Sequence, residues 1–233
     1  NQLAAAQRPD GAEWCYFTSP EGTKPYGPGI NCCVSSGPRG MALVPQCAAL
    51  RMPARTGQPE SLWINLWESM TVQTRLGGEM VTAKWQMRFP LAGAGTLELQ
   101  SARPVTCAVR LRVPRWAQPC TATFQGGTGT GVFPGDQEMT LVATDWTGAK
   151  VTLQFNLSAA KIEGDHGNID RRAFTWGPFV LAFDQQRNPG WPVPQRVVVP
   201  ESSDSATVGL TSPMGEPLGF KVPLSRADGS PPE

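Results

Sequence analysis

The stretch MTVQTRLGGEMVTAKWQMRF, residues 70–89, decides the fold class of this chain. Apolar and polar residues alternate on both sides of Gly77-Gly78, which is the period expected of strands with one buried face. A Gly-Gly pair between two such runs is typical of a tight hairpin turn, because glycine readily adopts the positive φ angles that the turn requires. The stretch therefore predicts an antiparallel pair of strands, over 70–76 and 79–89.

Similar strand-like runs flank this hairpin and are separated by Gly, Pro and Asp residues. The chain contains 25 Gly and 23 Pro in 233 residues, a composition that suits many short strands joined by turns. Strands are expected at 62–67, 96–100, 106–113, 121–124, 138–142, 150–157 and 173–183, with shorter runs at 196–199 and 219–222. This spacing predicts a mainly β chain that contains a β-sandwich domain.

The N-terminal part has a different pattern. A helix is expected at 37–50, because Met41, Val44 and Ala48 share one helical face. Pro38 would stand near the start of this helix, where proline is tolerated. We predict three regions. Residues 1–58 include this helix and a strand-like segment at 12–18, residues 59–225 are the β-sandwich region, and residues 226–233 are a disordered tail. A Pro- and Gly-containing linker at 51–60 spans the boundary between the first two regions.

Charge and hydropathy exclude two classes of partner. Lys and Arg number 20 against 19 Asp and Glu, so the net charge of +1 gives no electrostatic reason to expect nucleic-acid binding. No stretch approaches the roughly 20 apolar residues that a membrane span needs. The chain begins without Met and lacks the features of a secretory signal, so we expect the true N-terminus upstream. The compartment, cytoplasmic or periplasmic and secreted, stays open.

Two adjacent thiols, Cys32 and Cys33, are the first candidate for chemistry. Neighbouring cysteines do not readily form a disulfide with each other, but both can bind one metal ion, or one can act as a nucleophile. The alternative is a pair of small buried residues beside a turn. Arg39 follows six residues after the pair and could bind a carboxylate or a substrate hydroxyl, or it is a solvated helix residue.

Other residues are weaker candidates. Cys107 and Cys120 are either buried thiols or a bridge between strands. The lone histidine, His166, has only carboxylates nearby in sequence, which favours a polar loop over a catalytic one. Five tryptophans could include platforms that stack on sugars, although core packing is the ordinary role: Trp14, Trp116, Trp146, Trp176 and Trp191.

Several segments, in the same order along the chain, carry a resemblance to a known family. They are NCC at 31–33 with GPRG at 37–40, WINLW at 63–67, Phe89-Pro90, VRLRVPRWA at 109–117, DWTG at 145–148 and WGPFVLA at 176–182. Together they resemble the C-terminal part of glycoside hydrolase family 127, also called DUF1680, which contains β-L-arabinofuranosidases. The later segments are similar to the family's "YP", "LRIPxWA", "W…GD" and "RGPLVYA" patterns.

The resemblance implies a two-part enzyme, with a catalytic (α/α)6 barrel followed by β-sandwich domains. Residues 1–58 would then be a short α-helical remnant of the barrel. Members are retaining glycosidases with a cysteine nucleophile, so Cys32 would be the nucleophile and a zinc ligand, and Cys33 a second zinc ligand. Zinc would be the cofactor and an arabinofuranoside or related glycan the substrate. Possible protein partners are the missing portion of the barrel or a second copy in a homodimer.

The chain departs from the family pattern upstream of the thiol pair. The family's remaining zinc ligands, a Glu and a Cys, and its acid/base Glu lie there, but only thirty-one residues precede Cys32. Glu13 and Cys15 have the Glu-x-Cys spacing, yet they lie in a segment that the family places after its metal-binding Glu and Cys. Without these upstream residues, we expect the chain to be inactive alone. Val34 also stands where members often have Pro, which leaves the substrate subclass open.

Two other classes of function stay open at this stage. The first is a non-catalytic β-sandwich that binds carbohydrate or a partner protein, which the tryptophans and the near-neutral charge permit. The second is a member of the family that has lost catalysis and survives as a structural domain. Zinc that is bound stoichiometrically and lost on substitution of Cys32 would favour the enzyme.

Overall fold

The computed structural model describes residues 5–16, 18, 24–27, 32–117, 119–125, 131–133, 137–143, 145–169, 171–184, 188–189, 197–198, 209–210, 219–222 and 225–226. Its contacts divide the chain into two compact units. The first, called here the sandwich unit, is Gly29–Leu157, and the second unit combines Asn1–Pro28 with Ser158–Glu233. These limits differ from the predicted regions, because the predicted helix belongs to the sandwich unit and the strands after Leu157 do not.

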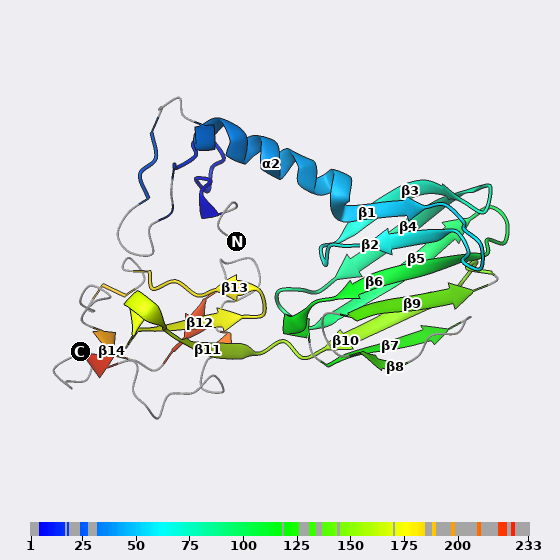
Figure 1. The fold of residues 1–233 in the computed structure, drawn as a ribbon. Helices are drawn as coiled ribbons and strands as arrows, with labels where there is room; N and C mark the ends of the chain where they lie inside the picture. The colour runs from blue at the N-terminus through cyan, green and yellow to red at the C-terminus, as the bar shows by residue number, and fades with distance from the viewer. Residues whose placement is uncertain are drawn as a thin grey trace. The chain divides into compact units, whose positions relative to one another are not determined.

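The sandwich unit contains two β-sheets that pack face to face (Figure 1). The six-stranded sheet has the order β3 (Met70–Leu76), β4 (Glu79–Met87), β5 (Ala94–Ser101), β10 (Lys150–Phe155), β7 (Cys120–Gln125) and β8 (Gly131–Phe133). The four-stranded sheet has the order β1 (Ala49–Met52), β2 (Ser61–Ile64), β6 (Cys107–Val113) and β9 (Gln137–Ala143). The β2–β6 pair is parallel and the other pairs are antiparallel. The predicted mainly β class and β-sandwich are confirmed.

The β3–β4 hairpin forms where the sequence predicts it. Leu76 pairs with Glu79 across the turn, and Gly77 and Gly78 have φ angles of 58° and 85°. Both angles lie in the left-handed region, which explains why two glycines occupy the turn.

The core of the sandwich unit lies between the two sheets. Alternate residues of the strands point inward, as in β4, where Val81, Ala83 and Trp85 are buried between exposed or half-buried neighbours. Trp67 packs edge-on against Trp85, with a centroid distance of 6.0 Å. The ring of Trp67 also meets Phe155 at 5.0 Å. The period of two therefore fixes which face of each strand is buried.

Some strands were placed wrongly or missed in the sequence. The run at 173–183 is not one strand but two, β12 (Arg172–Trp176) and β13 (Phe179–Val180), because the chain turns at Gly177, where φ is 53°. The predicted linker at 51–60 contains the end of β1, and β8 was not predicted. β2 ends at Ile64 instead of 67.

The second unit has smaller sheets. β11 (Ala159–Glu163), which was not predicted, pairs with β12, and β12 pairs with β13. Two-stranded ladders join β14 (Val197–Val198) to β17 (Ser225–Arg226) and β15 (Gly209–Leu210) to β16 (Phe220–Lys221). In the described part of the strand-like segment predicted at 12–18, Trp14 and Cys15 form isolated bridges instead of a continuous strand. The predicted tail at 226–233 lies outside the described residues, apart from Arg226 in β17.

Two short 3-10 turns complete the described elements, η1 (Arg115–Ala117) and η2 (His166–Asn168). Within the described part of the chain, no helix has both the length and the apolar character needed to cross a membrane.

Candidate functional site

The thiol pair opens the helix α2 (Cys32–Ala48). This helix begins five residues before the predicted start, so the pair lies in its first turn and not in the preceding loop. The prediction failed because proline was expected near the start of the helix, whereas Pro38 and Pro45 both lie inside it. Each proline removes one backbone donor, which a helix can tolerate where other contacts support it.

The two sulfur atoms are in direct contact. Cys32 Sγ and Cys33 Sγ lie 3.6 Å apart, within reach of an S–H···S hydrogen bond, and both residues are exposed free cysteines. This hydrogen bond with Cys32, followed by local burial and the charge of Cys32, raises the pKa of the Cys33 thiol. The interpretation of the pair as buried residues is therefore wrong, and the pair is an accessible dithiol.

The donor set fits part of a zinc site. Two thiolates that share a tetrahedral zinc, with Zn–S bonds of about 2.3 Å, lie about 3.8 Å apart, close to the observed distance. A closed site needs four ligands. Among the described residues, no three His, Cys, Asp or Glu side chains come together in a way that could hold a metal ion. The described residues thus bring together two thiols, which is half the number of ligands that a closed zinc site would need.

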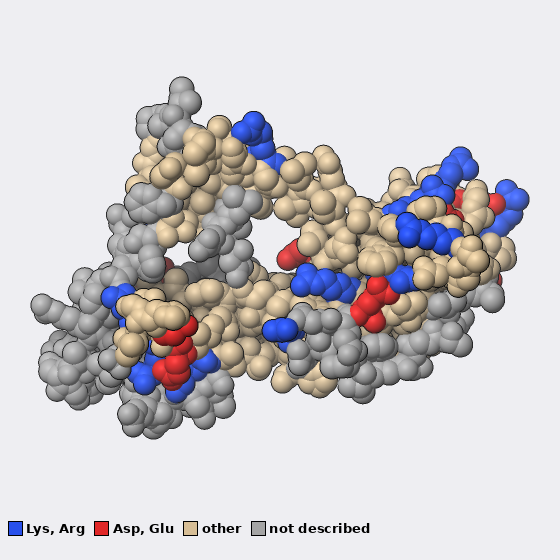
Figure 2. All heavy atoms as spheres, viewed as in Figure 1, with Lys and Arg blue, Asp and Glu red and all other residues tan. Residues whose placement is uncertain are grey.

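Arg39 lies on the same helix as the pair. It follows Cys32 by seven residues, which places it about two turns, or about 10 Å, further along nearly the same face. Its Nη2 donates a hydrogen bond to Ser36 Oγ at 2.9 Å, and the residue is exposed. The surface over α2 is otherwise almost uncharged, as Figure 2 shows. No described contact assigns Arg39 a substrate, so its binding role stays a prediction.

In the second unit, Glu13 is ion-paired and Cys15 is buried. Arg8 forms ion pairs with both Glu13 and Asp10. The hydrogen bond from Arg8 holds the pKa of the Asp10 carboxyl down at about 2. Cys15 is buried, with 1% of its surface exposed. The Glu13 carboxylate is therefore paired with a cation, and the Cys15 thiol is shielded from solvent. Neither group is presented as an open metal ligand.

Cys107 and Cys120 are buried thiols, and His166 lies in a polar, exposed turn. Cys107 and Cys120 are free and buried, and burial raises their pKa values to about 12 and about 11. His166 is exposed in η2, with Nε2 3.9 Å from a carboxylate oxygen of Asp165. Neither these thiols nor His166 forms a nucleophile–base pair with the described residues around it.

The tryptophans pack mainly against protein. Trp14 and Trp146 are buried, and Trp146 Nε1 donates a hydrogen bond to the Cys107 carbonyl at 3.0 Å. Trp116 and Trp176 are half-buried, while Trp191 lies outside the described residues. Trp116 stacks on Phe89, with ring centroids 5.0 Å apart. Core packing therefore accounts for most of the described members of this set.

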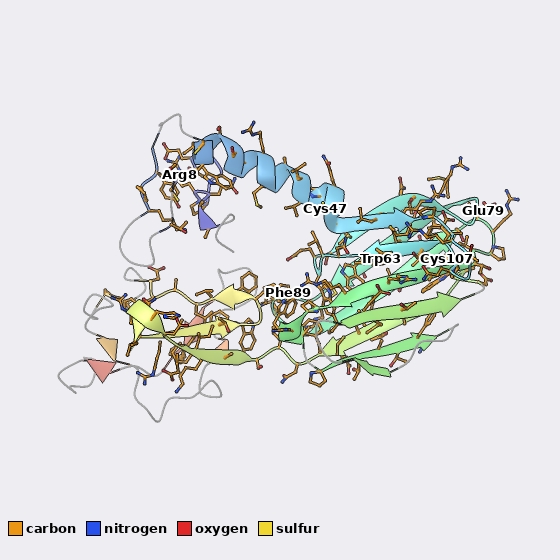
Figure 3. All side chains as sticks on the ribbon, viewed as in Figure 1. Arg8, Cys47, Trp63, Glu79, Phe89 and Cys107 are labelled. Carbon is orange, nitrogen blue, oxygen red and sulfur yellow. The ribbon has the colours of Figure 1, made fainter. Side chains whose placement is uncertain are left out.

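A polar cluster on the four-stranded sheet was not found from the sequence. The Arg110 guanidinium lies 5.3 Å from the ring centre of Trp63, a residue labelled in Figure 3, and its Nη1 donates a hydrogen bond to Glu138 Oε1 at 2.8 Å. The three residues lie on different strands, β2, β6 and β9. The β2–β6 register pairs Trp63 with Arg110, and the β6–β9 pairing brings Glu138 beside Arg110, so no local pattern could have revealed the cluster.

Comparison with known proteins supports a resemblance to one family. Residues 61–157 match the family model of the middle domain of GH127 β-L-arabinofuranosidases. The match covers β2 to the end of the sandwich unit. No curated protein matches the sequence significantly.

Solved structures share the fold. A GH127 β-L-arabinofuranosidase from Geobacillus stearothermophilus T6 matches with a TM-score of 0.70 and 17% identity, over 89% of this chain and 34% of that one. A structure described as a glycoside hydrolase matches at 0.63 and 15%, over 76% and 31%. A GH127 β-arabinofuranosidase matches at 0.60 and 15%, over 76% and 30%.

The predicted resemblance to the GH127 family is confirmed. The chain spans about a third of the length of the solved structures it matches. At this level of identity the structural matches show the fold, and the activity named in their titles belongs to those proteins.

Proposed function

We propose that this chain is the C-terminal portion of a retaining, zinc-dependent glycoside hydrolase that acts on arabinofuranosides or related glycans. One observation carries the proposal. The segment that matches the GH127 middle domain follows a helix whose first turn presents two exposed thiols in contact.

Cys32 is the proposed nucleophile, and Cys32 and Cys33 are the proposed zinc ligands. A bound zinc ion would keep both sulfurs deprotonated at neutral pH. The Cys32 thiolate attacks the anomeric carbon as the bond to the leaving oxygen breaks, and a carboxylic acid gives that oxygen its proton. Water then displaces the sulfur, with the same carboxylate acting as the base. The family resemblance assigns that acid to a Glu upstream of the thiol pair.

The composition and exposure of α2 support its origin in a larger helical domain. Arg39 is the only charged residue in the seventeen-residue helix, and Gly37 is its only buried residue. Leu43 and Val44 remain 55% and 39% exposed. A helix that is apolar on most sides is ordinarily buried. These features fit a remnant of the barrel whose neighbouring helices are not part of the described chain.

The activity test compares two proteins on an arabinofuranoside that releases a chromophore. The 233-residue chain should show no hydrolysis, because it lacks the proposed acid and has two thiol ligands where four are needed. A longer protein that adds the upstream barrel should hydrolyse the substrate with retention of configuration, and Cys32→Ser should abolish this activity. Cys47→Ser, an exposed thiol on the same helix, is the matched control and should have no effect.

Three outcomes would contradict the proposal. Hydrolysis by the 233-residue chain alone would show that the acid lies within it. Full activity of the longer protein after Cys32→Ser would exclude the nucleophile. Retention of the chain on polysaccharide, together with a longer protein that binds no zinc and has no activity, would favour a carbohydrate-binding module.

A further inference from the structure

We propose that Cys32 and Cys33 form a capture site for trivalent arsenicals. The inference rests on the contact between their sulfur atoms and not on the proposed hydrolase activity. The two Sγ atoms lie 3.6 Å apart at the start of α2, and both side chains are exposed.

The distance between the sulfurs selects the geometry of the bound centre. A linear two-coordinate ion with bonds like the Zn–S bond of about 2.3 Å would need sulfurs about 4.6 Å apart, more than the pair offers. A bent centre brings its two sulfur ligands closer together. Trivalent arsenic is such a centre, since it is pyramidal and prefers soft thiolate ligands. The pair can therefore chelate arsenic with little movement of α2.

The other cysteines cannot offer the same chelate. Cys15, Cys107 and Cys120 are buried. Cys47 is exposed, but it follows Cys33 by fourteen residues, which places it about 21 Å away along the helix axis. Among the described residues, one dithiol is thus available to an arsenical in the folded chain.

The reaction with an organoarsenic oxide balances without a further reagent. Each thiol loses its proton as an As–S bond forms, and the oxide oxygen leaves with both protons as one molecule of water. Arsenic remains trivalent and sulfur is not oxidised. The second As–S bond forms within one molecule, so its effective concentration strengthens binding by roughly 100-fold or more over a single thiol.

Phenylarsine oxide is the probe, and intact-mass spectrometry of the folded 233-residue chain is the measurement. We expect one arsenical per chain, removed by a dithiol such as ethanedithiol and resistant to an equal amount of a monothiol. Cys32→Ser and Cys33→Ser should each weaken binding by at least roughly 100-fold. Cys47→Ser should bind as the unchanged chain does. Circular dichroism verifies that each variant keeps its strands.

Each alternative result overturns the proposal. These are an adduct that survives either Cys32→Ser or Cys33→Ser, an adduct that depends on Cys47, and the absence of an adduct on the folded chain. Capture is measured without zinc and without substrate. It can therefore fail while the hydrolase proposal stands, and it can succeed in a chain with no activity.

Discussion

Trp146 and Trp116 should contribute differently to the stability of the fold, because they differ in burial and in hydrogen bonding. Trp146 is fully buried, stacks on Phe124 with centroids 4.7 Å apart, and donates its indole N–H to a backbone carbonyl. Trp116 is half-buried and contributes its ring to an aromatic cluster. Both residues are tryptophans, and the sequence alone does not show which of them is fully buried.

Trp146→Phe tests this difference. The substitution keeps a ring in the core but leaves the Cys107 carbonyl without its indole donor, so the free energy of unfolding should fall by about 1–3 kcal/mol. Urea unfolding followed by circular dichroism gives the value. Trp116→Phe is the control, and its cost should be smaller, below about 1 kcal/mol, since its ring is only half-buried. Equal losses in both variants would contradict this account.

Glu68 and Glu98 should give opposite responses to pH. Partial burial of its carboxyl raises the pKa of Glu68, although the residue as a whole is exposed, so the folded state slightly disfavours its charge. Glu68→Gln should therefore stabilise the protein at neutral pH, by a few tenths of a kcal/mol for so exposed a group. This gain should shrink as pH falls through the raised folded pKa towards the unfolded value of about 4.3.

Glu98 has a partner in Lys150, whose ammonium lies 2.8 Å from its carboxylate and lowers the pKa of Glu98. Glu98→Gln should thus destabilise the protein at neutral pH. The loss should disappear as pH falls through the folded pKa, since the unchanged protein then loses the same ion pair. Unfolding curves at pH 7 and at a pH below 4 measure both variants, and effects of the same sign at pH 7 would refute the assignment.

At the scale of elements, α2 and the strands that follow it were predictable to different degrees. The β3–β4 hairpin follows from local alternation and from two glycines, because both signals act within twenty residues. The limits of α2 do not follow in this way, since two internal prolines argue against a continuous helix. The exposure of α2 likewise depends on what packs against it and not on its own sequence.

Substitutions at Leu43 and Leu62 compare how much a leucine contributes to stability on α2 and in the core of the sandwich unit. Leu43 is 55% exposed on α2, so Leu43→Ala should change the free energy of unfolding by less than about 0.5 kcal/mol. Leu62 in β2 is 1% exposed, and Leu62→Ala should cost about 2–5 kcal/mol. Chemical denaturation measures both. A large cost at Leu43 would mean that the helix is covered in solution.

Gly93 and Gly95, around the start of β5, allow a clash with backbone to be compared with a clash with a side chain. A Cβ at Gly93 would meet the backbone carbonyl of Phe155, whereas a Cβ at Gly95 would meet the flexible end of Met87. Gly93→Ala should therefore destabilise the protein more, by more than about 2 kcal/mol, because the strand pairing must shift to relieve the clash. Thermal unfolding of both variants tests the order, and a larger loss at Gly95 would contradict it.

At the scale of the whole molecule, the two compact units have cores of unequal size. The described core of the sandwich unit joins buried residues from both of its sheets, whereas that of the second unit centres on Ala159 and Phe174. The match to the GH127 middle domain lies entirely in the sandwich unit. The segment with the clearest family match is therefore also the one with the larger described core.

Hydrogen exchange should reveal the difference between the units. Amides of β4, β5 and β10, in the interior of the six-stranded sheet, should exchange more slowly than those of β11, β12 and β13. We expect protection factors at least about tenfold higher in the sandwich unit, because opening its strands exposes the larger core. Uniform protection across both sets would show that the units unfold as one.

The sequence by itself determined the β class, the hairpin at Gly77-Gly78 and the family resemblance, because each depends on local periodicity or on short segments in a fixed order. Tertiary structure alone decided which tryptophans are buried, the Trp63–Arg110–Glu138 cluster, and the division of the strands between two units. Those features arise from strand pairs whose members are distant in sequence, such as β2 with β6. It also decided the state of the thiol pair, since the early start of α2 puts both sulfurs in one exposed turn, 3.6 Å apart.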